Sequence, residues 1–326
     1  MYDVITVGSA TLDVFAKTKF SELIKIMDSK GETDLLAYPT GSKILIEELE
    51  FTTGGGGTNA AVALSRLGHK TAWLGKLGKD ENSDYILKKL KEEKVDSLAV
   101  RGKAYGGYSI ILDSIEHDRT ILAYKGANDE LDFKEVPLKR LKTRWFYFSS
   151  MLDRSFQTLE KLAYYAEKNN IRIAFNASSY LAKKGPNYLK NILKRTDIFI
   201  LNREEASYLA KGKDTKELLR KLSLLGPKIV AITDGKNGAF VFDGKRFYTA
   251  MPHKVKVVET TGAGDAFASS FLSGLLKKND IKFALKLAII NAESVIQYHG
   301  AKNKLLTYRE ALKILKKMPV KIRIFP

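Results

Sequence analysis

The chain of 326 residues carries a net charge of +18 and contains no cysteine. This length suffices for one large α/β core or two modest domains, and the lack of cysteine excludes disulfides, a thiol nucleophile and a cysteine metal site. Lysines are scattered among glutamates, a pattern typical of solvated helix faces, so we expect no specific nucleic-acid partner. We also expect a cytoplasmic protein without membrane contact, because no stretch approaches the roughly 18–20 apolar residues of a membrane span and no basic-then-apolar leader precedes the first strand.

Strand-like runs alternate with helical stretches along most of the chain. The predicted strands are Val4–Val7, Thr71–Leu74, Trp145–Phe148, Arg172–Phe175, Ile198–Leu201, Ile229–Thr233 and Ala239–Phe242. The predicted helices are Ala60–Gly68, Ser83–Lys94, Ser155–Asn169, Glu204–Leu209, Thr215–Leu224, Ala266–Lys277 and Ile281–His299. This alternation predicts an α/β fold with three layers, in which helices cover both faces of a doubly wound, mostly parallel sheet. Ligands bind such sheets beyond the carboxyl ends of the strands, where Asp13, Asn202 and Asp234 occur.

Two regions interrupt this alternation, residues 14–53 and about 100–126. They contain β-type runs such as Lys43–Glu48 and Tyr108–Leu112. Within the first region, the pattern of Phe20–Met27 predicts an amphipathic helix.

The segment Thr260–Asp265 consists of small residues and directly precedes an apolar, helix-forming stretch. The backbone N–H groups of such a loop can hold an anion at the helix N-terminus, where they lack intrahelical partners. Asp265 would repel a phosphate that is merely bound, but it is suited to take a proton from a hydroxyl that attacks a phosphoryl group. A plain helix start, with the aspartate capping free amides, is the alternative.

A second glycine-rich segment, Gly54–Asn59, directly precedes the predicted helix Ala60–Gly68. Four consecutive glycines allow the backbone to approach a ligand closely. Asn59 adds a side-chain donor and acceptor, which suits a polyol hydroxyl. A flexible loop that ends in a helix cap is the alternative.

Taken together, the Gly-Gly-x-Gly-x-Asn pattern at Gly54 and the Gly-Ala-Gly-Asp pattern at Gly262 resemble the two signatures of the ribokinase-like (PfkB) carbohydrate kinase family. Four smaller resemblances occur in the same order as in that family: Val4–Asp13, Tyr124–Asn128, Asn202–Glu205 and Thr233–Gly238. The resemblance covers nearly the whole chain. It implies one ribokinase-like domain over residues 1–326, with a small β-sheet lid formed by about 14–53 and 100–126.

The resemblance also implies ATP-dependent transfer of a phosphoryl group to a sugar hydroxyl. Asp265 would be the general base, and the loop Gly262, Ala263, Gly264 and Asp265 would form the anion hole. The expected substrate-binding residues are Asp13, Gly55, Gly56, Asn59 and Arg119. The expected nucleotide-binding residues are Asn176, Asn202, Thr233, Gly235, Gly238 and Asn291, although Asn176 also suits a turn and Asn291 an ordinary helix position.

The implied cofactors are ATP and Mg²⁺. Magnesium keeps much of its water, so Glu205 is expected to act on it through bound water. A monovalent cation such as K⁺ is expected at Glu259 and Thr261, although Glu259 replaces the more usual aspartate.

The sequence leaves the acceptor open. Gly56 stands where ribokinases commonly carry lysine, which argues against ribose itself. Arg119 and Lys125 suit a sugar phosphate, whereas Phe15 or Tyr108 suits the base of a nucleoside. The non-enzyme alternative is a nucleotide-binding regulatory protein, which would gain nothing from a base at Asp265.

The 18–41 segment is longer than a minimal lid requires. It either extends the lid, packs in a homodimer formed through the lid, or is a simple surface insertion.

Overall fold

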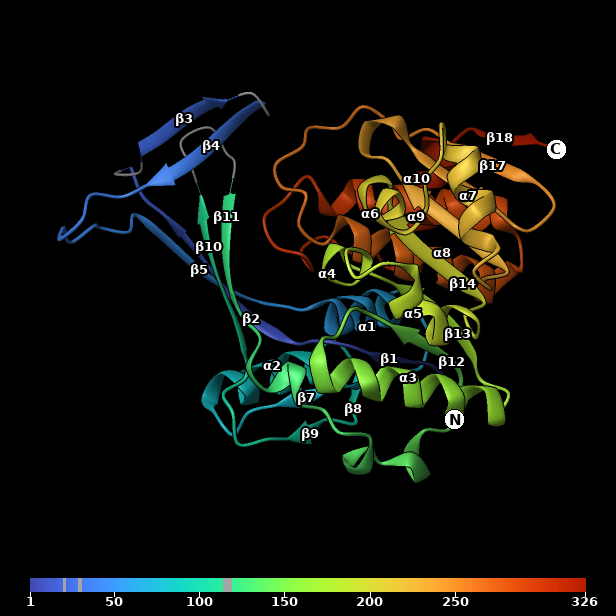
Figure 1. Ribbon diagram of the computed structural model, residues 1–326, viewed down its shortest axis with the longest axis horizontal. Coiled ribbons are helices and arrows are strands. Elements are labelled where there is room, and N and C mark those ends of the chain that lie inside the picture. Colours follow the sequence, from blue (N-terminus) through green and yellow to red (C-terminus); the bar gives the residue numbers. More distant parts are fainter. Residues whose placement is uncertain (20–21, 29–30, 114–118) are drawn as a thin grey trace.

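The computed structural model describes residues 1–19, 22–28, 31–113 and 119–326 (Figure 1). Its central element is a ten-stranded sheet with the order β18-β17-β16-β15-β14-β13-β12-β1-β6-β8. Neighbours from β15 to β8 pair in parallel, and β16, β17 and β18 add antiparallel pairs at one edge. The prediction of a mostly parallel α/β sheet is therefore confirmed. The strands are β1 Tyr2–Val7, β6 Thr71–Leu74, β8 Asp96–Ser97, β12 Thr143–Phe148, β13 Arg172–Asn176, β14 Ile198–Asn202, β15 Ile229–Thr233, β16 Ala239–Phe242, β17 Phe247–Ala250 and β18 Ile322–Phe325.

Helices cover both faces of this sheet because alternate side chains of each strand point to opposite sides. In β1, for example, Val4 packs into one core and Ile5 into the other, and both are fully buried. The first core lies under α1 Gly56–Arg66, α8 Ala263–Lys278, α9 Ile281–Val295 and α10 Tyr308–Lys317. The second lies under α3 Asp153–Lys168, α4 Ser179–Ala182, α5 Pro186–Leu193, α6 Arg203–Leu209 and α7 Thr215–Ser223. A third apolar cluster joins α1 to α2, Glu81–Glu92.

A separate four-stranded sheet, called the small sheet below, projects from this body (Figure 1). Its order is β11-β10-β2-β5, and only β2 and β10 pair in parallel. At its far end stands a separate hairpin of β3 and β4. These strands are β2 Thr11–Lys17, β3 Glu22–Asp28, β4 Gly31–Ala37, β5 Glu48–Gly54, β10 Gly107–Asp113 and β11 Arg119–Tyr124. The remaining elements are β7 Lys76–Leu77, β9 Val100–Arg101 and the 3-10 turns η1 Gly126–Asp129, η2 Phe133–Glu135, η3 Leu138–Arg140 and η4 Gly235–Asn237.

Two local predictions in this region are wrong. The helix expected over Phe20–Met27 is strand β3 from Glu22 onward, and Phe20 lies outside the described residues. The hairpin partner β4 supplies backbone hydrogen bonds that favour the extended form of the branched residues Ile24 and Ile26.

The strand expected over Lys43–Glu48 begins only at Glu48. Its partner β2 ends at Lys17, which pairs with Glu48, so the preceding residues have no strand of the small sheet beside them.

Candidate active site

The loop before α8 turns sharply at Gly262, which is the N-cap of the helix. Gly262 has φ of 79°, and a Cβ there would lie 2.6 Å from the Cα of Ala301, so only glycine fits. The amide of Ala263, a residue of the expected anion hole, donates to the carbonyl oxygen of Thr260 at 3.2 Å and is therefore already occupied. The next two amides, of Gly264 and Asp265, belong to the first helical turn, where an α-helix supplies no acceptor. A Cβ at Gly264 would meet no atom within 4 Å, so open space lies in front of this turn.

Asp265 is held by a residue from the other glycine-rich segment. The amide Nδ2 of Asn59 donates to Oδ2 of Asp265 at 2.8 Å. Burial raises the pKa of the Asp265 carboxyl, and the Asn59 hydrogen bond and the Lys302 charge oppose that rise. Among the described residues, the buried Oδ1 of Asn59 has no hydrogen-bond partner. Because buried acceptors are rarely left unsatisfied, this oxygen suits a ligand hydroxyl.

The glycine run packs tightly against the β1–β2 connection. A Cβ at Gly55, whose φ is 90°, would lie 2.5 Å from the carbonyl oxygen of Ser9. A Cβ at Gly56 would lie 2.1 Å from Oγ of Ser149 and 3.2 Å from Oδ1 of Asp265. The helix α1 begins at Gly56, four residues before the predicted start, because Gly55 acts as its N-cap. No side chain, lysine included, fits at Gly56 without movement of Ser149.

A cavity of about 200 Å³ opens beside these residues. It brings together three of the predicted site residues, Gly56, Asn176 and Asp265. Lys125 lines the same cavity, and its Nζ lies 4.8 Å from the ring centroid of Tyr180. The cleft thus joins the carboxyl end of β13 to the start of α8.

Asp13 lies next to the glycine run. It is 7% exposed and accepts a hydrogen bond from Oγ1 of Thr11 at 2.7 Å. A Cβ at Gly54 would lie 1.9 Å from Oδ2 of Asp13, so the loop backbone passes directly over this carboxylate. Burial raises the pKa of Asp13, against hydrogen bonds from Thr11 and Ser109.

Asn202 and Glu205 form a reciprocal cap at the start of α6. Oδ1 of Asn202 accepts from the amide of Glu205 at 2.8 Å, and Oε2 of Glu205 accepts from the amide of Asn202 at 2.9 Å. Burial raises the pKa of Glu205 to about 7. These side chains are already bonded to the backbone, so they suit indirect contact with a metal rather than direct ligation.

Thr233 ends β15 beside that cap, and Gly235 and Gly238 lie in the turn that leads to β16. Thr233 pairs in register with Asn202, and Gly235 has φ of 50° with open space around it. The neighbouring Asp234 forms an ion pair with Arg203 at 3.1 Å.

The structure contradicts the prediction that Asn291 contacts the nucleotide, because its side chain is 0% exposed. Nδ2 donates to Oγ of Ser270 at 2.6 Å, and Oδ1 accepts from the amide of Leu306 at 2.9 Å. Asn291 therefore ties α9 to α8 and to the loop before α10, and presents no surface to a ligand.

The two residues expected at a monovalent cation lie together before α8. Glu259 is 7% exposed, and its Oε2 accepts from the amide of Gly300 at 2.8 Å. Oγ1 of Thr261 is buried and finds no hydrogen-bond partner within the described part of the chain. Arg119 begins β11 in register with Asp113, and the described structure places only its backbone.

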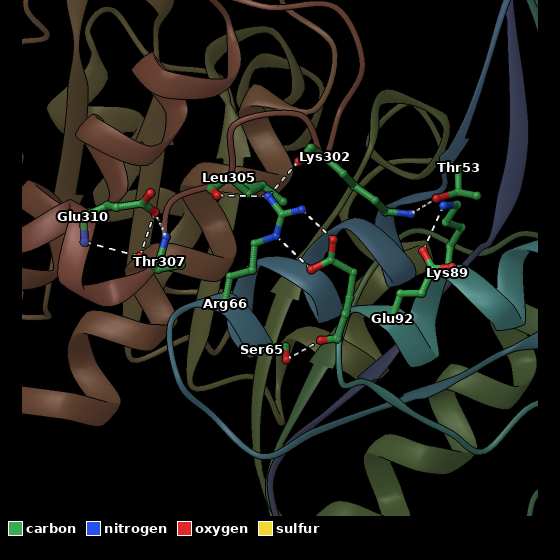
Figure 2. A network of polar contacts seen from close by, with 10 residues as sticks. Thr53, Ser65, Arg66, Lys89, Glu92, Lys302, Leu305, Thr307 and Glu310 are labelled. Carbon is green, nitrogen blue, oxygen red and sulfur yellow. Dashed lines mark hydrogen bonds and ion pairs between the residues drawn. The ribbon is translucent and has the colours of Figure 1, made fainter.

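Lys302 is a residue that the sequence analysis missed. Its Nζ donates to Oγ1 of Thr53 at 3.0 Å and to Oγ1 of Thr58 at 2.8 Å (Figure 2 shows the contact with Thr53). Burial lowers the pKa of Lys302 to about 7, and the negative charges of Asp13 and Asp265 oppose that change. No local motif marks this lysine, because only the tertiary fold brings it beneath the glycine run.

Over the ranges that the structure describes, no three His, Cys, Asp or Glu side chains gather as a metal site. Within the same ranges, no helix has both the length and the apolar character needed to cross a membrane.

Comparisons with known proteins agree with this geometry. A family model described as pfkB family carbohydrate kinase matches residues 20–307. An uncharacterized sugar kinase of Archaeoglobus fulgidus is 31% identical over 244 residues, which cover 74% of this chain and 97% of that protein. An ATP-dependent 6-phosphofructokinase of Thermoanaerobacterium thermosaccharolyticum is 29% identical over 311 residues, covering 92% and 89%.

Solved structures show the same fold. Ribokinase from Thermotoga maritima superposes with a TM-score of 0.81 at 21% identity, covering 97% of this chain and all 100% of that one. An E. coli protein described as a ribokinase II, in complex with ATP and Mg²⁺, gives a TM-score of 0.82 at 18% identity, with coverage of 97% and 100%.

Proposed function

Because the chain belongs to the pfkB family of carbohydrate kinases, we propose that it transfers the γ-phosphoryl group of ATP to a hydroxyl of a sugar. The position of Asp265 carries this proposal. Its carboxylate lies in the first turn of α8 and lines a cavity shared with Gly56 and Asn176. A carboxylate there repels a phosphate but can accept a proton, which suits catalysis better than binding alone. The similar E. coli structure contains ATP and Mg²⁺, which supports the proposal that this chain binds both.

In the proposed reaction, Asp265 accepts the proton of the attacking sugar hydroxyl. A bond forms between that oxygen and the γ-phosphorus, and the bond from the phosphorus to the β–γ bridging oxygen breaks, so that ADP leaves. General base catalysis of this kind contributes about 10²–10⁴-fold to a rate. The amides of Gly264 and Asp265, together with the positive end of the α8 dipole, stabilise the charge on the transferring group.

The sugar is assigned to the polar groups beside the glycine run. Oδ1 of Asn59 is a buried acceptor, and the carboxylate of Asp13 lies beneath the same glycine run. We assign the remaining sugar hydroxyls to these two side chains and to the backbone at Gly55. Binding there would bring the acceptor oxygen into line with the γ-phosphorus.

The nucleotide is assigned to the carboxyl ends of β13, β14 and β15, at Asn176, Asn202 and the turn Thr233–Gly238. Mg²⁺ would neutralise the phosphate charge and orient the leaving group. The carboxylate of Glu205 fits this role through water, since the Asn202 amide already occupies Oε2. For a monovalent cation, the buried Oγ1 of Thr261 and the carboxylate of Glu259 supply oxygen ligands of the right chemistry.

An unphosphorylated sugar and a sugar phosphate are both compatible with the site. Lys125 on the cavity wall favours a phosphorylated acceptor, and the 6-phosphofructokinase relative supports this second candidate. The lysine that is common in ribokinases would fit at Gly56 only with movement of Ser149.

The experiment is ADP release from Mg-ATP with a panel of sugars, sugar phosphates and nucleosides. The proposal is supported if the protein turns over one acceptor class far better than the others and ³¹P NMR locates the new phosphate ester on that acceptor. ATP binding without turnover of any acceptor would favour a nucleotide-binding regulatory protein.

The small sheet would act as the lid that excludes water from the reaction, and as a homodimer face. By register, Leu49, Phe51, Leu122 and Tyr124 share one face of the small sheet and are exposed there, and the hairpin exposes Ile24, Ile26, Met27 and Leu35. Patches of this kind mark interaction sites in soluble proteins. The measurement is sedimentation of the wild type, of Phe51→Glu and of the control Leu224→Glu, an exposed apolar position outside the small sheet. A dimer that only Phe51→Glu dissociates would support dimerisation through the small sheet, and a monomer at all concentrations would contradict it.

A further inference from the structure

Lys302 lies in the loop after α9, and its backbone is fixed to the end of α1. Nη1 of Arg66 donates to the carbonyl oxygens of Lys302 at 3.2 Å and of Leu305 at 3.0 Å. The same guanidinium pairs with Glu93 at 2.5 Å. Figure 2 shows the Lys302 side chain leaving this network and running toward Thr53. The backbone anchor therefore directs a lysine into the interior beneath the site.

The ammonium of Lys302 ties the two ends of the glycine run together. Its partners Thr53 and Thr58 stand immediately before and after Gly54–Gly57. Oγ1 of Thr58 also donates to the carbonyl oxygen of Gly54 at 2.5 Å. Four glycines are costly to hold in one conformation, so a bridge between their flanking residues limits the motion of the loop that carries Gly55 and Gly56.

The same ammonium supplies positive charge to both carboxylates of the proposed site. The charged groups that face it are Asp13 on β2, Asp265 on α8, Glu93 after α2 and Arg66 on α1. Lys302 lowers the pKa of both Asp13 and Asp265, whereas burial raises both. Burial disfavours the charged form of each carboxylate, and the positive charge of Lys302 favours it.

We propose that Lys302 is a positioning residue for phosphoryl transfer, which fixes the glycine run and favours the ionised forms of Asp13 and Asp265. The inference rests on the proposed kinase function. Lys302 touches neither the acceptor oxygen nor the phosphoryl group in this account, and acts through the loop and the two carboxylates. Because burial lowers its pKa to about 7, the ammonium is lost as the pH rises through that range. Transfer should therefore decline on the alkaline side of neutrality.

The test compares Lys302→Met and Lys302→Arg with the control Lys277→Met. Lys277 is another lysine whose pKa burial lowers, but its Nζ lies 4.1 Å from the Tyr308 ring centroid, away from the cavity. In Lys302→Met we expect kcat/KM to fall at least ~10-fold and its acid limb to move to higher pH, because Asp265 loses a favourable charge. Lys302→Arg should recover most of the activity and move the alkaline limb upward, because a guanidinium stays charged. Lys277→Met should change neither limb.

Two results would overturn the inference. One is wild-type activity and pH limbs in Lys302→Met. The other is a loss of activity that moves neither limb and that arginine does not restore, which would indicate a merely structural lysine. Failure of the kinase proposal is distinguishable, because the wild-type protein would then turn over no acceptor.

A second measurement is independent of activity and of the arginine variant's folding. The ¹³Cε signal of Lys302, assigned with Lys302→Met, reports its titration directly. The pKa should fall in Asp13→Asn and in Asp265→Asn, because each carboxylate stabilises the ammonium. If the pKa of Lys302 is unchanged in both variants, the proposed electrostatic coupling between Lys302 and the two carboxylates is wrong.

Discussion

Nδ2 of Asn59 donates a hydrogen bond of 2.8 Å to Oδ2 of Asp265, although 206 positions separate the two residues in the chain. The bond joins the first turn of α1 to the first turn of α8. It orients one carboxylate oxygen and leaves Oδ1 on the side of Gly56. The two glycine-rich segments therefore form one site, in which the first segment positions the proposed base supplied by the second.

Asn59→Ala removes this hydrogen bond and the buried acceptor together. Hydrogen bonds to charged groups are worth about 1.5–3 kcal/mol, so we expect kcat/KM to fall roughly 10- to 100-fold. The control is Asn191→Ala, which removes a 2.9 Å hydrogen bond to Glu160, and neither of these residues lines the cavity. Activity of Asn59→Ala within twofold of the wild type, measured by coupled ADP release, would argue against this positioning role.

The pH dependence of kcat/KM should show an acid limb that belongs to Asp265. Burial raises the pKa of this carboxyl above its ordinary value. A base acts only when deprotonated, so activity is lost as the pH falls through the raised pKa, at a higher pH than an exposed aspartate would give. A rate that stays constant down to the ordinary range of aspartate would contradict this assignment.

Gly56→Ala should destabilise the protein by roughly 1–3 kcal/mol, because the new methyl group collides with Ser149. The added Cβ would lie 2.1 Å from Oγ of Ser149 but 3.3 Å from its Cβ. Gly56→Ala combined with Ser149→Ala should therefore recover part of the loss in a double-mutant cycle. Gly264→Ala is the stability control, since its Cβ meets nothing within 4 Å. Equal denaturant midpoints for Gly56→Ala and Gly264→Ala would contradict the packing account.

Asn291→Ala should behave as a core defect rather than a nucleotide-site defect. It leaves the amide of Leu306 and the hydroxyl of Ser270 without their partner, and a buried unsatisfied group costs about 1–3 kcal/mol. We expect a lower unfolding midpoint with an unchanged KM for ATP. A raised KM for ATP at full stability would restore the role that the sequence first indicated.

The sheet could be predicted from the sequence because its central strands are short, continuous apolar runs buried on both faces. In β1 and β12, every residue of Val4–Val7 and Trp145–Phe148 is buried, as the strands of a parallel sheet covered on both faces require. The glycine motifs were likewise readable, because only glycine tolerates the close approach at Gly56 and the positive φ at Gly262.

Other features depend on tertiary partners that no local pattern records. Residues 22–28 satisfy a helical pattern, but hairpin pairing with β4 decides their conformation. Asn291 lies on a predicted helix, yet its direction is set by Ser270 and Leu306. Nothing in the sequence distinguishes Lys302 from the many other lysines. Its position becomes evident only in the fold, where Arg66 holds the loop after α9.

Asp265→Asn removes the proposed base of the phosphoryl transfer while keeping the size of its side chain. The measurement is ADP release with the preferred acceptor, alongside calorimetric titration of ATP into the same protein. We predict ATP affinity within a few-fold of the wild type and transfer lowered by about 10²–10⁴-fold. Transfer near the wild-type rate in Asp265→Asn would contradict the account.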